Sequence, residues 1–338
     1  MDLKERIEAF SKLGQRIQSL TEEEMSDLSQ KALNQNPWFT SESVRTSLKG
    51  IAKMLDHGAL NKWTSKYSLN KPQSKIVGIA MAGNIPLVGF HDFLSTLIAG
   101  HKPMIKLSSQ DAQLLPALSR WLLEVEPRFA SLIAFEEKLK GYDAAIATGS
   151  DNTSRYFEYY FKNVPHIIRK NRSSCAIIQG MESEEELKAL GTDVFTYFGL
   201  GCRNIAKLFV PEEYDFNLML KTWEQFGDII NHNKYANNYD YQRAIHLVNR
   251  IPFFDNGSVI LLEDEKLVSP ISVLYYERYT DQDDLASRLD RNRAKTQCFV
   301  SAKGWYKGSL SFGQAQFPEV DDYADDVDTL QFLSSLND

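Results

Sequence analysis

The stretch that decides the fold of this chain is residues 75–107, KIVGIAMAGNIPLVGFHDFLSTLIAGHKPMIKL. Two short apolar runs, at 75–81 and 102–107, have the length and composition of buried strands. Between them, residues 86–99 have the length and apolar content of a helix. A strand, a helix and a second strand in this order predict parallel strands joined by a right-handed crossover.

The same alternation continues along the chain and predicts a larger parallel sheet. Residues 112–125 and 153–161 have helical patterns, and strand-like segments fall at 131–135, 142–147 and 174–178. Because helices of this length join neighbouring parallel strands, we expect these strands in one sheet, with the segment at 174–178 closing the series.

The regions on either side of this sheet have different patterns. In the first 70 residues, apolar side chains recur every three or four positions, and Thr21 with Glu24 has the pattern of a capping box. This part is predicted to be helical, and we interpret it as a packing or acyl-channel element. A second α/β region is predicted further on, with strand-like segments at 258–262, 271–276 and 297–301.

Composition is that of an ordinary globular protein. The chain has 338 residues, of which 43% are hydrophobic and 25% are charged, and its net charge is −7. A negative net charge gives no general attraction to nucleic acid or to anionic membranes. No apolar run reaches membrane-spanning length, and the first residues lack the apolar core of a signal peptide. We therefore expect a cytoplasmic protein without nucleic-acid or membrane partners.

The three cysteines are widely spaced and odd in number, which predicts neither a disulfide framework nor a metal site. Cys175 and Cys298 lie in strand-like apolar segments and are expected to be structural. Cys202 instead follows the small-residue turn Gly199-Leu-Gly201, ahead of a helix or a strand. Exposed backbone N–H groups at such a turn would favour a thiolate and can hold an oxyanion. An isolated cysteine, however, is more often a small buried hydrophobe.

Three further polar features lie where predicted strands end and helices begin. Asn84 follows the first strand, Lys106 ends the second, and the turn Thr148-Gly-Ser150 leads into a helix. Open α/β sheets bind ligands at the carboxyl ends of their strands, and a helix N-terminus favours phosphate. Taken singly, each feature has a simpler interpretation, as a turn asparagine, a solvated lysine and an ordinary turn. The chain has neither a G-x-G-x-x-G fingerprint nor a Walker A loop.

Taken in order, these features resemble the acyl-CoA reductase (LuxC-type) branch of the aldehyde dehydrogenase superfamily. Asn84-Ile-Pro86 is similar to the superfamily's Asn-Phe-Pro, and Thr148-Gly-Ser150 is similar to its Thr-Gly-Ser cofactor turn. Gly201-Cys202 is similar to its glycine-flanked nucleophile, and Lys106 lies about as far downstream as the family's strand-end lysine.

The resemblance covers roughly residues 75–330, because later segments at 269–273 and 312–329 are also similar to the family. It implies an α/β fold of the aldehyde dehydrogenase type, with a parallel-sheet nucleotide-binding domain, an α/β catalytic domain and a helical N-terminal segment. The expected parts are the helical segment at 1–70, the nucleotide-binding domain at 71–180, the domain of the catalytic thiol at 181–311, and a tail at 312–338 that packs back on the body.

The same resemblance implies a reaction. Cys202 would attack an acyl thioester such as acyl-CoA, and the Asn84 amide with the Cys202 backbone N–H would stabilise the oxyanion. A hydride from a nicotinamide would then release the aldehyde, since a thiol is both a good nucleophile and a good leaving group. Hydrolytic members carry a glutamate in a segment that corresponds to residues 165–172, and no carboxylate is present there. We therefore expect reduction rather than hydrolysis.

The cofactor that the resemblance implies is NADPH. Relatives that prefer NAD often place an acid three residues after the strand-end lysine, where this chain has Ser109. An acid would repel the 2′-phosphate of NADPH, whereas Ser108 or Ser109 can donate a hydrogen bond to it. The superfamily's glutamate ahead of Phe-Gly-Pro, which helps to hold the nicotinamide ribose, has Glu265 as its nearest counterpart in this chain. The expected cofactor-binding residues are Lys106, Ser108, Ser109, Thr148, Gly149 and Ser150.

Other hypotheses remain open at this point. An acyl-phosphate reductase on the same fold would use the same nucleophile, and a binding protein derived from this fold would have no turnover. Among the histidines, His232 is the first candidate proton donor, although a structural role is the commoner case for each of them. A homodimer is expected only by analogy with the superfamily.

Overall fold

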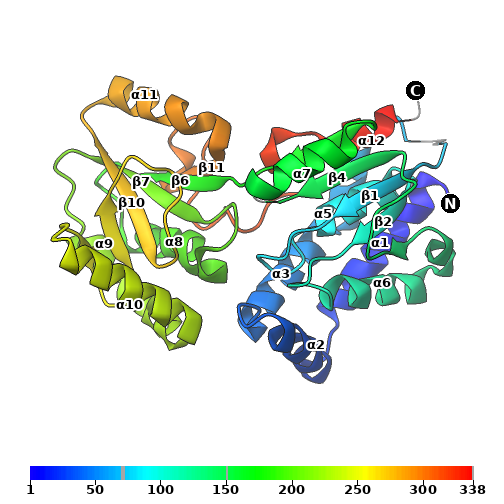
Figure 1. The fold of residues 1–338 in the computed structure, drawn as a ribbon, viewed down its shortest axis with the longest axis horizontal. Helices are drawn as coiled ribbons and strands as arrows, with labels where there is room; N and C mark the ends of the chain where they lie inside the picture. Colours follow the sequence, from blue (N-terminus) through cyan, green and yellow to red (C-terminus); the bar gives the residue numbers. More distant parts are fainter. Residues whose placement is uncertain (70–72, 150, 337–338) are drawn as a thin grey trace. The chain divides into compact units, whose positions relative to one another are not determined.

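The computed structural model describes residues 1–69, 73–149 and 151–336, with backbone alone at 151 and 152. Contacts between residues divide the chain into two compact units. The first comprises Met1–Asn171 together with Pro318–Asp338, and the second comprises Arg172–Phe317 (Figure 1).

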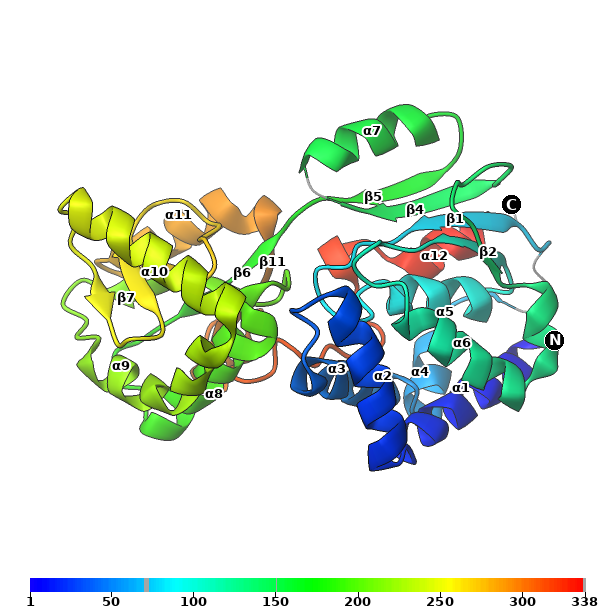
Figure 2. The same ribbon diagram turned by 60° about the horizontal axis from the view of Figure 1, so that its bottom comes forward.

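A five-stranded parallel sheet with the order β3-β2-β1-β4-β5 forms the centre of the first unit. Ile79 on β1 lies between Ile105 on β2 and Ile146 on β4, so that one face of the sheet is apolar. Helix α7 covers one face, and α5, α6 and α12 lie on the other (Figure 2). The strands are β1 Ile76–Ala80, β2 Lys102–Lys106, β3 Ala134–Phe135, β4 Ala144–Thr148 and β5 His166–Arg169. The helices are α5 Phe90–Ile98, α6 Leu114–Val125 and α7 Asp151–Phe161.

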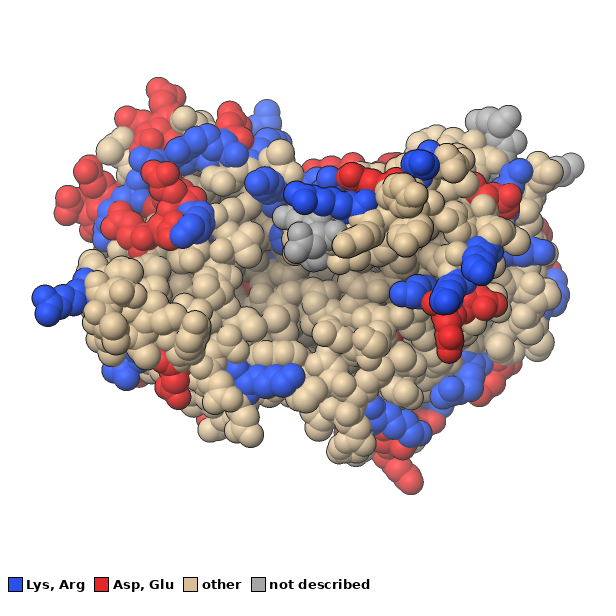
Figure 3. All heavy atoms as spheres, viewed as in Figure 1, with Lys and Arg blue, Asp and Glu red and all other residues tan. Residues whose placement is uncertain are grey.

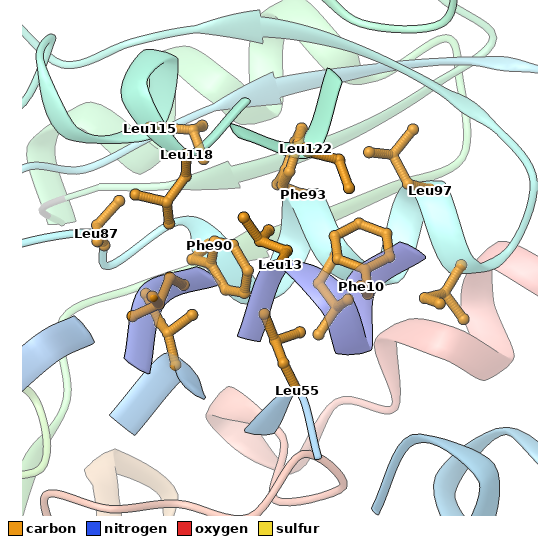
Figure 4. Packing of buried hydrophobic residues seen from close by; sticks show 14 of the residues in the cluster. Phe10, Leu13, Leu55, Leu87, Phe90, Phe93, Leu97, Leu115, Leu118 and Leu122 are labelled. Atoms are coloured by element: carbon orange, nitrogen blue, oxygen red, sulfur yellow. The ribbon is translucent and has the colours of Figure 1, made fainter. Parts of the chain in front are cut away.

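Four N-terminal helices share the core of this first sheet. Phe10 and Leu13 of the first helix point toward Phe93 of α5 and Leu118 of α6 (Figure 4). The rings of Phe10 and Phe93 are 6.3 Å apart in an edge-to-face arrangement. Burial of each such side chain contributes about 1.5–3 kcal/mol, so these helices are an integral part of the first unit. They are α1 Leu3–Gln18, α2 Glu22–Gln35, α3 Ser41–Met54 and α4 His57–Thr64.

The capping box predicted at Thr21 is confirmed. The Thr21 hydroxyl accepts a hydrogen bond from the Glu24 N–H, and the Glu24 carboxylate accepts one from the Thr21 N–H. A second capping box, formed by Asp2 and Glu5, begins α1. Both pairs satisfy backbone donors that a helix N-terminus otherwise leaves without an acceptor.

Buried polar contacts attach the C-terminal segment to the first unit. The Arg169 guanidinium donates to both oxygens of Asp92 and to the Thr329 hydroxyl at the start of α12 (Thr329–Ser335). The Nε2 atoms of His91 and His101 lie 2.8 Å from the carbonyls of Val320 and Leu333, respectively. Burial lowers the pKa of both histidines, so each is a neutral structural donor rather than a proton source.

The second unit is built on a seven-stranded sheet with the order β12-β11-β6-β7-β10-β9-β8, in which only the β8–β9 pair is antiparallel. Helix α11 lies on one face, and α8 and α9 lie on the opposite face (Figure 1). The strands are β6 Ser173–Ile177, β7 Ile205–Pro211, β8 Phe254–Asp255, β9 Ile260–Glu263, β10 Val273–Tyr279, β11 Thr296–Ser301 and β12 Leu310–Ser311. The α-helices are α8 Glu184–Phe195, α9 Asn217–Trp223, α10 Asn233–Val248 and α11 Gln282–Asn292.

Short 3-10 helices lie in the connections between these elements. They are η1 Pro127–Ser131, η2 Thr196–Gly199, η3 Glu224–Asn231, η4 Arg293–Lys295, η5 Ala302–Gly304 and η6 Ala324–Asp326. In the part of the chain that is described, no helix is long and apolar enough to cross a membrane.

Three local predictions are wrong. The strand expected at 174–178 does not close the first sheet, because β6 pairs with β7 and β11 in the second. The helix expected from residue 86 begins at Phe90, since Leu87 has a φ of 59° and cannot continue a right-handed helix. Most of the segment expected as a strand at 131–135 is irregular, with pairing at Ala134–Phe135 alone.

Candidate active site

Cys202 lies in a turn that joins α8 to β7, and the backbone ahead of it is unusual. Tyr197, Phe198 and Gly199 have φ values of 53°, 58° and 77°. Residues with side chains rarely adopt this left-handed conformation, which costs about 1–2 kcal/mol for each of them. Such a segment persists only where its surroundings fix it, and strained backbone of this kind is concentrated at functional sites.

The side chain of Asn204 fixes this turn. Its Oδ1 accepts a hydrogen bond from the Gly201 N–H at 2.8 Å. Its Nδ2 donates to the carbonyls of Thr196 at 2.7 Å and Asp193 at 3.0 Å. Asn204 has 1% of its surface exposed. It therefore links the end of α8 to the residue before Cys202 through buried hydrogen bonds. No periodic pattern in the sequence indicates this role, although an asparagine two residues after a glycine-flanked cysteine is a typical turn residue.

The prediction of exposed N–H groups at this turn is partly wrong. The Gly201 N–H is bonded to Asn204, and the Leu200 N–H donates to the Tyr197 carbonyl at 3.1 Å. Both groups are therefore used to build the turn. The Cys202 N–H stays a predicted oxyanion donor.

The three thiols have different surroundings. Cys175 is fully buried on β6, and burial raises its pKa to about 12. Cys298 is half-buried on β11, and burial raises its pKa to about 11. Cys202 is half-buried in the turn rather than on a strand. The Ser174 hydroxyl donates to the Cys202 carbonyl at 3.0 Å and lies 3.1 Å from the Cys298 sulfur, so the strand thiol is close to the main chain of the turn.

The buried carboxyl group of Asp193 stabilises the segment that is connected to the same turn. The Asp193 oxygens accept hydrogen bonds from the N–H groups of Gly313 at 2.6 Å and Ala315 at 3.0 Å. Burial raises the pKa of Asp193 to about 7. Because the Asp193 carbonyl also accepts a hydrogen bond from Asn204, the residue joins the segment after β12 to the turn of Cys202.

His232 lies beside this turn. Its ring is 4.4 Å from that of Phe198, and its Nδ1 accepts a hydrogen bond from the Tyr235 N–H at the start of α10. The ring thus packs against one of the left-handed residues. Its role as a proton donor stays a prediction.

In the first unit, the loop that carries Asn84 lies against the loop that carries Ser108, at the carboxyl edge of the sheet. A Cβ atom added to Gly83 would lie 2.6 Å from the Ser108 Oγ, so the loops after β1 and β2 are in close contact. Asn84 is exposed directly after Gly83, and Lys106 is exposed at the end of β2. Only a glycine allows this approach of the two loops.

Helix α2 supports these loops from a distant part of the sequence. The Gln35 amide donates to the Ser109 carbonyl at 2.7 Å and accepts from the Ala112 N–H at 2.9 Å. Asn36 donates to the Gly83 carbonyl at 3.4 Å. The N-terminal helices therefore contribute to the candidate cofactor edge, which the sequence analysis did not predict.

Asp111 also stabilises the carboxyl edge of the first sheet, through the loop after β1. Its Oδ2 accepts a hydrogen bond from the Leu87 N–H at 2.7 Å, which holds the left-handed Leu87 in place. Burial raises the pKa of Asp111 to about 6. The carboxyl group is thus directed into the fold rather than toward the exposed Ser109.

The third predicted cofactor segment lies on the next strand of the same sheet. Thr148 ends β4 beside Arg169 of β5, and the Gly149 N–H donates to the Arg169 carbonyl at 3.2 Å. A Cβ on Gly149 would lie 3.0 Å from the Phe157 ring of α7, so the glycine allows this helix to pack closely. Ser150 lies outside the described residues.

The donors at this edge fit a phosphorylated nucleotide. They comprise the Lys106 cation, the hydroxyls of Ser108 and Ser109, and the strand-to-helix turn at 148–149. Cations, hydroxyls and helix N-termini are the groups that bind phosphate in proteins. Among the described residues, no group of three or more His, Cys, Asp or Glu side chains is arranged to hold a metal ion.

Comparisons with solved structures identify the fold. Aldehyde dehydrogenase 21 from Physcomitrella patens, in complex with the reaction product succinate, aligns over 100% of this chain and 85% of its own, with a TM-score of 0.67 and 12% identity. An aldehyde dehydrogenase from Mycobacterium tuberculosis complexed with NAD+ aligns over 89% of this chain and 73% of its own, with a TM-score of 0.63 and 16% identity. An NADP dependent enzyme from E. coli gives a TM-score of 0.64 at 12% identity, over the same shares of the two chains.

These likenesses confirm the predicted fold, an α/β structure of the aldehyde dehydrogenase type with N-terminal helices. No curated protein sequence gives a significant match. The sequence profile of the family described as Acyl-CoA reductase (LuxC) matches residues 15–218, which include the loops of the first sheet and the turn of Cys202. The chain therefore belongs to the LuxC family of acyl-CoA reductases, oxidoreductases with the aldehyde dehydrogenase fold.

Proposed function

We propose that this protein reduces an acyl-CoA to the corresponding aldehyde at the expense of NADPH, with Cys202 as the acyl carrier. The observation that supports this most is the nucleophile turn. Of the three cysteines, Cys202 alone lies on a turn, and a buried side chain, Asn204, fixes that turn. A structural thiol needs no such construction, whereas a nucleophile must be held in one geometry.

In the proposed first half-reaction, the Cys202 sulfur attacks the thioester carbon. The Asn84 amide and the Cys202 N–H would donate hydrogen bonds to the oxygen as it becomes negative. When the carbonyl re-forms, the bond to the sulfur of coenzyme A breaks, and that sulfur leaves as a thiolate. The product of this step is acyl-Cys202.

In the second half-reaction, the carbonyl carbon of acyl-Cys202 would accept a hydride, which is the chemistry that a nicotinamide cofactor held at the first sheet would supply. The same two donors would stabilise the new oxyanion, and its collapse breaks the bond to the Cys202 sulfur and releases the aldehyde. Competing attack by water needs a general base. The segment 165–172 contains no carboxylate, and in β5 the Arg169 guanidinium is paired with Asp92, which supports reduction over hydrolysis.

We further propose that the edge of the first sheet holds the NADPH. Lys106, Ser108 and Ser109 would bind the adenosine ribose and its 2′-phosphate, and the turn that begins with Thr148 and Gly149 would bind the diphosphate. The neutral hydroxyls favour NADPH over NADH, because a carboxylate at Ser109 would repel a 2′-phosphate. Ser109 is exposed, and its carbonyl is held by Gln35.

The test is the oxidation of NADPH by the purified protein with a series of acyl-CoA chain lengths. Wild type should turn over at least one chain length and should release aldehyde, and NADH should be the poorer reductant. Cys202→Ala should lose activity by about a thousandfold or more, whereas Cys298→Ala should keep most of it. Full activity in Cys202→Ala would overturn the mechanism, and activity with a matched acyl phosphate alone would favour the acyl-phosphate reductase.

A further inference from the structure

In the second sheet, the charged side chains before the strands are basic, and those after the strands are mainly acidic. We call these two sides of the sheet, where the strands begin and where they end, its two edges. Strands β11, β6, β7, β10 and β9 are parallel, so they all begin at one edge and end at the other. The segments that lead into these strands are residues 292–295, 172, 201–204, 269–272 and 256–259. Their only charged side chains are basic, and these are Arg172, Arg203, Arg293 and Lys295.

The segments that follow the same strands are mainly acidic. Lys266 and Lys303 are the only cations among the first four residues after each of the five strands. Figure 3 shows the same contrast along α11, with Asp and Glu gathered near its N-terminal end and Lys and Arg near its C-terminal end. The acids that follow the strands are Glu212, Glu213, Asp215, Asp264, Glu265, Asp281 and Asp283.

Two of the cations at the basic edge have no counter-ion among the described residues. Arg293 and Lys295 are exposed and make no ion pair with any residue that the structure describes. One turn earlier, Arg288 pairs with Asp284 at 2.9 Å, and Arg291 lies 3.6 Å from Glu277. The arginines of α11 thus form ion pairs within the fold, whereas Arg293 and Lys295 are available to a ligand.

These cations lie on the same edge as the nucleophile. Thr296 of β11 pairs with Ser173 of β6, and Ser174 pairs with Ile205 of β7. Two strand spacings, about 10 Å, therefore separate the start of β11 from the start of β7, which Cys202 precedes. The Ser174 hydroxyl, in contact with the Cys202 carbonyl and the Cys298 sulfur, lies between them.

We propose that Arg172, Arg293 and Lys295 of this basic edge bind the phosphates of the coenzyme A portion of the substrate, whereas Arg203 lies next to Cys202 and therefore beside the thioester. The proposal rests on the proposed function, because it takes the thioester to be at Cys202. Coenzyme A carries a diphosphate and a 3′-phosphate at the far end of its pantetheine arm, away from the sulfur. Guanidinium and ammonium groups bind phosphate strongly, and exposed cations also attract it from solution.

The neighbouring charges agree with this assignment. Arg172 donates to the Thr296 carbonyl at 3.3 Å, which holds its side chain near the start of β11. The nearest acid along the chain before Arg293 is Asp290 on α11, and the next acid after Lys295 is Glu319, in the first unit. An anion at this edge therefore meets little repulsion from the segments that form it.

The experiment compares two thioester donors, one with and one without the 3′-phosphoadenosine diphosphate part of coenzyme A. Acyl-CoA and the matching acyl-pantetheine are reduced by wild type, by Arg293→Gln/Lys295→Gln, and by the control Lys188→Gln/Lys221→Gln, which removes two exposed cations from α8 and α9. The first variant should lose about tenfold in kcat/KM with acyl-CoA and less than twofold with acyl-pantetheine. The control should match wild type with both donors. Equal losses with the two donors, or no loss with either, would overturn the proposal.

Binding without turnover separates this proposal from the proposed function. Calorimetry with free coenzyme A and with pantetheine should show that wild type prefers coenzyme A, that salt weakens this preference, and that the double variant loses it. This result would hold even if the protein reduced no thioester, in which case the proposed function alone would fail. A loss confined to the thioester of an acyl carrier protein would overturn the assignment to coenzyme A.

Discussion

The two sheets of this protein present their candidate functional groups at opposite edges. In the first sheet, Asn84 and Lys106 lie at the carboxyl ends of β1 and β2, which is the edge where open α/β sheets bind ligands. In the second sheet, Cys202 lies before the amino end of β7. The positions of Asn84 and Lys106 follow from the architecture of the first sheet. The position of Cys202 depends on the local hydrogen bonds of its turn.

The two edges are also held together in different ways. At the nucleophile turn, Asn204 bonds to Gly201, three residues away, and reaches back to the end of α8. At the first edge, the support is divided among side chains far apart in the sequence, including Gln35, which is 74 residues from Ser109. A single change should therefore damage the nucleophile turn more than the first edge.

The largest effect is expected for Asn204→Ala. The change leaves the buried Gly201 N–H and the Thr196 carbonyl without the Asn204 side chain, at a cost of about 1–3 kcal/mol for each group, while the Asp193 carbonyl keeps its hydrogen bond from Gln316 at 3.3 Å. We expect kcat to fall by about a hundredfold or more, with slower iodoacetamide labelling of Cys202. The matched change at the first edge, Asn36→Ala, should cost less than tenfold. Equal losses in the two variants would contradict the comparison.

A smaller effect is expected for Gly83→Ala. The new methyl group would lie 2.6 Å from the Ser108 Oγ and 2.8 Å from its Cβ, so the loops after β1 and β2 must separate. Overpacking of this kind costs about 1–3 kcal/mol, which should appear mainly as a higher KM for NADPH. Gly227→Ala is the control, because a Cβ there meets nothing within 4 Å. An unchanged KM would show that the cofactor does not depend on this contact.

Sequence patterns predict the first edge better than the second sheet. The strands at 75–81 and 102–107 and their crossover helix have clear signals, so the loops after them could be placed from the sequence alone. A strand pattern does not indicate which sheet the strand joins, and β6 lies in the second sheet although its position in the sequence predicts the first. The late start of α5 depends on Leu87, whose left-handed backbone is fixed by Asp111, a contact 24 residues away.

The site residues differ in the same way. Cys202 was identified from its motif, but its support by Asn204 depends on how α8 ends, which no local pattern gives. Gln35 is an ordinary polar residue at a helix end, and its role at the Ser109 loop follows only from the packing of α2. Residues that act through long-range contacts leave no periodic signal in the sequence.

A buried aspartate with a raised pKa supports each edge, Asp193 at the turn of Cys202 and Asp111 at the first sheet, and the two should respond differently to pH. Burial raises the pKa of Asp193 to about 7 and that of Asp111 to about 6, from 3.8 in the unfolded chain. The folded protein then binds more protons than the unfolded chain between pH 3.8 and these values. The contribution of each group to the free energy of unfolding therefore rises as the pH falls through this window, by at most about 1.4 kcal/mol per pH unit.

Asp193→Asn should remove this dependence below about pH 7, and Asp111→Asn should remove it only below about pH 6. The measurement is urea unfolding of wild type and both variants from pH 5 to pH 8. Differences between wild type and variant are compared because His91 and His101, whose pKa values are lowered by burial, act in the opposite direction in all three proteins. Stability differences that stay constant over this range would contradict the assignment.

The smallest effect is expected for Gln35→Ala, which removes two hydrogen bonds to the loop after β2. Gln35 is only half-buried, so water can replace the lost amide, and the net cost should be about 0.5–1 kcal/mol. We expect a two- to threefold higher KM for NADPH, an unchanged kcat, and unchanged labelling of Cys202. Gln30→Ala on the exposed face of the same helix is the control. If Gln35→Ala lowered the activity as much as Asn204→Ala, the first edge would also depend on a single side chain. The proposed difference between the two edges would then be wrong.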